Sequence, residues 1–271
     1  MRFGVCTWIF GDMPVEQIAD ALARLGYDGM ELMGDLQAHH PATIRATCQQ
    51  AGLSVLSLTP DNVDLAHPDA AIRSAALDYY RRLIDFAHEV GCPIVSCHGA
   101  VGRVRAIASQ EQEYGYLLGG VATLAPLAAD AGIRIAMEVL NRYESHLLNT
   151  AAQAVEFVQA VGHPSVGILL DAYHMNIEEA NPAQAVEHAG QRLFLFHVAD
   201  SNRAGLGLGH TDFPALAAAL KRIGYAGDVI VECTASGPDP FTPVKGEGWR
   251  DQLTEYLRRS RVYLQQVFAS H

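Results

Sequence analysis

Four side chains that can bind a metal ion follow four successive apolar segments of the sequence. They are Glu138, Asp171, His197 and Glu232, and they are spaced by roughly 30 residues, about the length of one strand–helix unit. The apolar runs that precede them cover residues 133–137, 166–170, 193–196 and 229–231. An ionised group at the end of a buried strand is costly unless another charge compensates it. One divalent cation would compensate all four.

Strand and helix signals alternate along the chain and predict a single-domain (β/α)8 TIM barrel over residues 1–271. This length is close to the ~250 residues typical of the fold, whose active site lies at the carboxyl ends of the strands. A capping box at Thr150 and Gln153 predicts one helix start, and Pro68 is expected in the first turn of another helix. Seven glycines follow helical patterns at positions where a left-handed backbone favours this residue: Gly26, Gly52, Gly91, Gly132, Gly162, Gly190 and Gly224.

Composition and charge exclude several classes of partner. The formal net charge is −11, with 19 Lys plus Arg and no basic run, so neither a nucleic acid nor an anionic membrane surface is an expected partner. No apolar stretch approaches the ~18 residues of a membrane span. Five cysteines without a C-x-x-C pair are typical of reduced thiols, which predicts a cytoplasmic protein.

The chemistry of the four candidate ligands indicates which metal they would bind. Three carboxylates and one imidazole, without a thiolate, favour Mn²⁺, with Mg²⁺ or Co²⁺ as alternatives, over a structural zinc ion. Cys92 and Cys97-His98 do not predict a zinc site, because no second ligand pair accompanies them. His98 is interpreted as a structural histidine with satisfied hydrogen bonds, and a position on the rim is the alternative.

Four longer motifs carry a family resemblance. The segments 138–144, 170–179, 197–203 and 209–213 resemble the ketose 3-epimerase family, the D-tagatose/D-psicose 3-epimerase group of the xylose isomerase-like barrels. The resemblance implies a homodimer or homotetramer that acts on a small keto-sugar. By the same resemblance, Glu138, Asp171, His197 and Glu232 bind the metal, Glu138 and Glu232 serve as acid/base carboxylates, and Glu144, His174 and Arg203 hold the substrate around O1 to O3.

Elementary chemistry agrees with epimerisation at C3. A metal on the carbonyl and hydroxyl oxygens would stabilise an enediolate, and inversion needs a proton donor on each face of it. Glu138 and Glu232, from the fifth and eighth strands, can stand on opposite faces. A sugar-binding barrel without turnover would not need this carboxylate pair. An endonuclease of the same barrel group would need more histidines and a basic groove.

The identity of the sugar stays open in the sequence. Residues 6–10 lack the fuller aromatic set of the family, and Thr234 stands where several members carry an aromatic residue. Trp8 is expected to form the floor of the pocket, with core packing as the alternative, and the long loop 234–248 is expected at the rim. The expected substrate is a ketohexose such as D-tagatose, D-fructose or D-psicose, or a ketopentose such as L-ribulose. The alternatives are a keto-sugar acid such as 5-keto-L-gluconate, or aldose–ketose isomerisation at the same metal.

Overall fold

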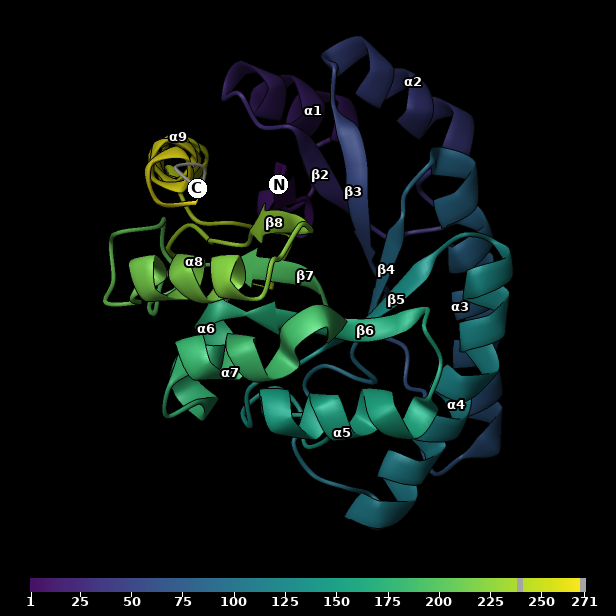
Figure 1. Ribbon diagram of the computed structural model, residues 1–271. Helices are drawn as coiled ribbons and strands as arrows, with labels where there is room; N and C mark the ends of the chain where they lie inside the picture. The colour runs from purple at the N-terminus through teal and green to yellow at the C-terminus, as the bar shows by residue number, and fades with distance from the viewer. Residues whose placement is uncertain (238–240, 269–271) are drawn as a thin grey trace.

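Eight parallel strands close into a barrel in chain order, with helices around the outside (Figure 1), so the predicted fold is confirmed. The computed structural model describes residues 1–237 and 241–268, so part of the predicted rim loop 234–248 and the last three residues of the predicted domain lie outside the described residues. The strands are β1 (Phe3–Cys6), β2 (Gly29–Met33), β3 (Ser54–Thr59), β4 (Ile94–Cys97), β5 (Arg134–Glu138), β6 (Val166–Asp171), β7 (Leu193–Val198) and β8 (Asp228–Val231).

The helices cover the outer face of this barrel, and most of them end at or just before one of the seven glycines that were predicted to follow helix ends. All seven glycines have φ between 54° and 77°. The capping box at Thr150 is confirmed, whereas the predicted helix start at Pro68 is wrong, because Asp69 caps the helix by accepting a hydrogen bond from the Ala71 backbone. The helices are α1 (Val15–Arg24), α2 (Pro41–Ala51), α3 (Ala70–Val90), α4 (Gln110–Asp130), α5 (Ala151–Val161), α6 (Ala172–Glu178), α7 (Pro182–Ala189), α8 (Phe213–Arg222) and α9 (Trp249–Val267), with 3-10 turns η1 (Trp8–Phe10) and η2 (Gly190–Arg192).

The register of the last strands brings their polar ends to one rim. Asp171 at the end of β6 pairs with His197 on β7. Val198 pairs with Val231 on β8, and the next residue, Glu232, donates its backbone N–H to the Val198 carbonyl at 2.9 Å. The strands are almost entirely buried, as expected for a parallel sheet covered on both faces.

The short helix α6 was not predicted from the sequence. It begins directly after β6, because the Asp171 side chain accepts a hydrogen bond from the Tyr173 backbone N–H at 2.9 Å and so acts as the N-cap. This turn places His174 in the first turn of the helix, next to the strand end. Among the helices of the described residues, none is both long enough and apolar enough for a membrane span.

Candidate active site at the carboxyl rim

His197 lies at the centre of the rim, and the other predicted metal ligands surround it. Its Nδ1 is 3.9 Å from Glu138 Oε1 and 3.8 Å from Glu232 Oε1. Asp171 Oδ2 lies 3.6 Å from Nε2 of His174. The four predicted ligands are all buried. Nδ1 of His197 and Oδ2 of Asp171 are buried without a hydrogen-bond partner in the described part of the chain. Barrel closure thus brings Glu138 and Glu232 to His197, and Asp171 pairs with His197 on the adjacent strand. Glu138 and Asp171 are not part of the one group of metal-capable atoms found within 4.8 Å of one another in the described residues, which consists of Glu31, His197 and Glu232.

Glu31 on β2 is a part of this site that sequence reasoning missed. Its Oε2 accepts a hydrogen bond from Ser57 Oγ at 2.5 Å, and its Oε1 accepts one from Thr59 Oγ1 at 2.7 Å. Nε2 of His197 lies 3.1 Å from Glu31 Oε2. The sequence did carry a signal, because Glu31 is an acidic residue inside an otherwise apolar strand.

The buried group Glu31, His197 and Glu232 could hold a metal ion, since their ligand atoms lie within 4.8 Å of one another. The contacts of Glu31 indicate a different use for this residue. Both of its oxygens already accept hydrogen bonds, and it faces Nε2 of His197, which leaves Nδ1 directed toward Glu138 and Glu232. A carboxylate behind the imidazole is the usual way to orient a metal-binding histidine. The unpartnered Nδ1, which faces two carboxylates, therefore fits a divalent cation on its own side of the ring, and the unpartnered Asp171 Oδ2 is a further candidate ligand.

The two rim glutamates sit in different electrostatic environments. Burial raises the pKa of Glu138 well above its usual value, and the charges of Glu232, Glu31 and Asp171 act in the same direction. Burial also acts to raise the pKa of Glu232, but His197, Arg203 and the Trp8 indole outweigh it and hold this pKa below the usual value. Burial, together with the Glu232 charge, raises the pKa of Asp171 to about 7.

The residues predicted to bind substrate line the same rim. Trp8 Nε1 donates a hydrogen bond to Glu232 Oε1 at 2.9 Å, and Arg203 Nη2 donates one to Glu232 Oε2 at 3.0 Å. Arg203 Nη1 lies 3.5 Å from Glu144 Oε1. Arg203 has a φ of 59°, a left-handed backbone that is uncommon for a residue other than glycine. Strain of this kind is often found at functional sites.

His174 is held neutral with a defined orientation. Its Nδ1 accepts a hydrogen bond from the Asn141 backbone N–H at 3.3 Å and lies 2.8 Å from Asn141 Nδ2. Burial, and next the charge of Arg203, lower its pKa to about 3. An Nδ1 that accepts leaves the proton on Nε2, which faces Asp171.

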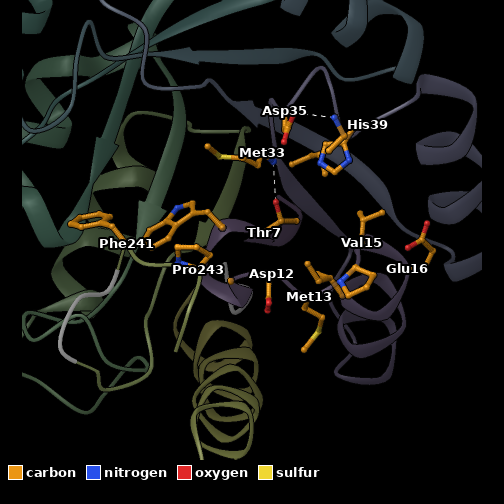
Figure 2. Close-up of a pocket in the computed structure, with 16 residues that line it drawn as sticks. Thr7, Asp12, Met13, Val15, Glu16, Met33, Asp35, His39, Phe241 and Pro243 are labelled. Carbon is orange, nitrogen blue, oxygen red and sulfur yellow. Dashed lines mark hydrogen bonds between the residues drawn. The ribbon is translucent and has the colours of Figure 1, made fainter. Parts of the chain in front are cut away.

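These side chains enclose a cavity of about 320 Å³, large enough for a small sugar. The cavity contains all four predicted substrate-binding residues: Trp8, Glu144, His174 and Arg203. A second cavity of about 520 Å³ lies beside it on the side of α1 (Figure 2) and shares Trp8, Met33 and Phe241 with it.

The sequence predicted no role for Phe241 beyond its position in the rim loop 234–248. Its ring stacks on the Trp8 indole, with ring centroids 5.6 Å apart. No residue pattern in the loop predicts this contact, which depends on how the loop after β8 crosses the rim. Phe241 therefore supplies an aromatic wall that the N-terminal segment and Thr234 do not.

His98, one residue beyond β4, was interpreted as a structural histidine with satisfied hydrogen bonds, and this interpretation is wrong. The ring lines the cavity, and its Nδ1 is buried without a partner in the described part of the chain. Burial lowers its pKa to about 4, so the ring is neutral near pH 7.

Comparison with known proteins agrees with this geometry. A profile of the xylose isomerase-like TIM barrel family matches residues 19–260. The chain is 32% identical over 253 residues to D-psicose 3-epimerase of Agrobacterium fabrum (strain C58), covering 86% of this chain and 83% of the relative. It is 37% identical over 222 residues to L-ribulose 3-epimerase of Methylomonas sp. (strain DH-1), covering 79% and 76%. A crystal structure of D-psicose 3-epimerase in the presence of D-fructose matches with a TM-score of 0.90 at 26% identity, over 99% of each chain. The chain therefore belongs to the xylose isomerase-like TIM barrel family and, within it, to the ketose 3-epimerase group of isomerases.

Proposed function

We propose that this protein is a metal-dependent ketose 3-epimerase that interconverts C3 epimers of a free keto-sugar. One observation carries the proposal. Glu138 and Glu232, from strands on different sides of the rim, both lie within 3.9 Å of the same nitrogen of His197 and line the same cavity. Epimerisation requires proton removal on one face of a planar intermediate and proton return on the other. Two carboxylates that face one small cavity from different strands meet this requirement.

The contacts of the two carboxylates favour one base and one acid. Glu232 accepts hydrogen bonds from Trp8 and Arg203, which stabilise its ionised form. Glu138 accepts no hydrogen bond from the residues that the structure describes. In one direction of the reaction Glu232 removes the proton from C3 and Glu138 returns one from the other face. In the reverse direction the two residues exchange roles.

The proposal includes a divalent ion held by Glu138, Asp171, His197 and Glu232, with Glu31 orienting the histidine. Such an ion, when bound, would act as a Lewis acid on the ketone and lower the cost of removing the C3 proton. The oxygen-rich ligand set favours Mn²⁺, with Mg²⁺ or Co²⁺ as alternatives. A dimeric or tetrameric assembly and a cytoplasmic location stay predictions from the sequence.

The charges around the cavity support an uncharged ketose. Arg203 is the single Lys or Arg among the described residues that line it, and its guanidinium already contacts Glu232 and Glu144. His98 and His174 are neutral near pH 7, since their pKa values are lowered to about 4 and about 3. Among the described residues that line the cavity, no cationic side chain other than Arg203 is available to a phosphate or carboxylate on the substrate. D-psicose, D-fructose, D-tagatose and L-ribulose are therefore the substrates that we propose to test, ahead of keto-sugar acids.

Hydrogen exchange in deuterated water tests the reaction directly. Protein loaded with Mn²⁺ is incubated with each ketose in D₂O, and incorporation of deuterium is followed by NMR. We expect deuterium at C3 together with the C3 epimer. Deuterium confined to C1 or C2 would instead establish an aldose–ketose isomerase.

Matched variants assign the exchange to the two carboxylates. Glu138→Gln and Glu232→Gln should each slow exchange at C3 by at least about 100-fold, the lower range for general acid–base catalysis. Glu178→Gln is the control, because this carboxylate pairs with Arg142 outside the cavity and the substitution removes the same charge. Exchange that persists at the wild-type rate in both rim variants would refute the assignment.

A further inference from the structure

His98 is a polar side chain of the cavity that the proposed reaction does not use. It is 6% exposed, and neither ring nitrogen makes a hydrogen bond within the described part of the chain. Buried polar atoms are almost always paired in folded proteins, and an exception calls for an explanation. A neutral imidazole carries one donor and one acceptor nitrogen, and a sugar hydroxyl can pair with either of them.

The barrel register places His98 next to the reacting carboxylates. Cys97, the residue before it, pairs with Met137, the residue before Glu138. His98 and Glu138 therefore follow paired positions on adjacent strands, which lie about 4.8 Å apart in a sheet. Glu232 lines the same cavity as His98 and Glu138. His98 thus lies beside the two carboxylates that would flank C3.

The other polar groups on this side of the cavity are already engaged. Thr59 Oγ1 donates its proton to Glu31 Oε1. Asn62 uses both ends of its amide, because Nδ2 donates to the Val101 carbonyl at 2.9 Å and Oδ1 accepts from the Val101 N–H at 2.8 Å. Met33 and Leu140 are apolar. Among the described residues that line this side, His98 is the one with a buried side-chain polar atom that has no hydrogen-bond partner.

We propose that His98 binds the hydroxyl on C4 of the ketose and sets the preference between substrates of opposite configuration at that carbon. The inference rests on the proposed function and on the orientation that the family resemblance implies, in which O1 to O3 face His174, Arg203 and Glu144. The chain of the sugar beyond C3 then runs toward β2, β3 and β4, where His98 is the first polar group with free hydrogen-bonding capacity.

D-Fructose and D-tagatose provide the test, because they differ only in configuration at C4. The ratio of their kcat/KM values is measured for the Mn²⁺-loaded wild type, His98→Leu and His98→Gln, with epimerisation followed by deuterium exchange at C3. We expect His98→Leu to change the ratio by about threefold to tenfold, the range for one neutral hydrogen bond, by acting on one epimer. His98→Asn, measured alongside them, places its amide nitrogen near Nδ1, the nitrogen without a partner, and should keep most of the wild-type ratio, whereas His98→Gln, whose amide falls near Nε2, should lose it.

The outcomes separate this inference from the proposed function. If the wild type exchanges deuterium at C3 and the ratio of kcat/KM values in His98→Leu stays within twofold of the wild-type ratio, only the role of His98 is overturned. An equal loss on both sugars also overturns it, since it would show that His98 only positions Glu138. No exchange at C3 in the wild type overturns the proposed function and the inference with it. If His98→Leu fails to fold, His98→Gln replaces it and should lose the ratio that His98→Asn keeps.

Discussion

Replacement of Glu31 by glutamine should weaken metal binding although Glu31 is not among the proposed ligands. The Glu31 carboxylate contacts three donors: Ser57 Oγ at 2.5 Å, Thr59 Oγ1 at 2.7 Å and His197 Nε2 at 3.1 Å. A glutamine has one acceptor oxygen and one NH₂ group, so it cannot accept from all three. If the NH₂ group faces His197, the imidazole must move its proton to Nδ1, the nitrogen that we assign to the metal.

The size of the effect follows from the bond that is weakened. A hydrogen bond to a charged group contributes about 1.5–3 kcal/mol, which corresponds to a factor of about 10–100 in an equilibrium constant. Measured effects of removing the partner behind a metal-binding histidine fall in the same range. We therefore expect Glu31→Gln to raise the Kd for Mn²⁺ by about 10- to 100-fold. The fold should survive, because the side-chain volume is unchanged.

Competition with a chelator of known affinity measures this Kd, and Glu178→Gln serves as the charge-matched control. A change below twofold in Glu31→Gln would refute the orienting role of Glu31. A loss of all measurable binding would show that Glu31 is itself a ligand, together with His197 and Glu232, as their mutual distances within 4.8 Å would also permit. Thermal unfolding of the metal-free proteins separates both results from misfolding.

Three further outcomes are expected. Arg203→Lys should lower kcat/KM for the preferred ketose by about 10-fold or more, because an ammonium group cannot keep the paired contacts with Glu232 and Glu144. Unchanged kinetics would contradict this expectation. Arg103→Met should lower the free energy of unfolding by about 3–5 kcal/mol in urea titration, since it removes the guanidinium that pairs with the fully buried Glu113. The double variant Arg103→Met/Glu113→Gln should recover part of this loss. Mn²⁺ at 100 times its Kd should raise the free energy of unfolding by about 2.7 kcal/mol over chelator-treated protein, and coincident unfolding curves would count against a bound metal.

The fold and the outline of the site could be predicted because they depend on local patterns. Each proposed ligand follows an apolar run, and parallel strands leave such residues at one rim. The glycines that end the helices fixed the number of units, since their positive φ is a local requirement. Asp171 and His197 could be placed together without coordinates, because Asp171 ends β6 and His197 is the residue before the end of the neighbouring strand β7.

The residues that were missed or misjudged depend on closure of the barrel. Glu31 and His197 are far apart in the sequence, and their contact exists because β1 joins β8 and brings β2 near β7 across the barrel. Phe241 reaches Trp8 from a loop without a periodic pattern. His98 has the residue type and burial of a structural histidine, and only its unpaired nitrogen distinguishes it. Hydrogen-bond satisfaction is a property of the whole fold, which explains why sequence patterns do not report it.

The balance of charge at the rim argues for a cationic ligand independently of any relative. Glu31, Glu138, Asp171 and Glu232 are buried together, while Arg203, the guanidinium among them, is already in contact with Glu232. Burial raises the pKa of Asp171 to about 7 and that of Glu138 well above its usual value, although Glu31 and Glu232, against burial, also raise the pKa of His197, so the protein groups compensate these two carboxyl groups poorly. Buried ionic groups are often less stabilising than apolar residues of the same size. A buried group of carboxylates lowers the free energy of unfolding, so it is expected only where function requires it. A divalent ion is the ligand that would compensate the largest number of these negative charges at once.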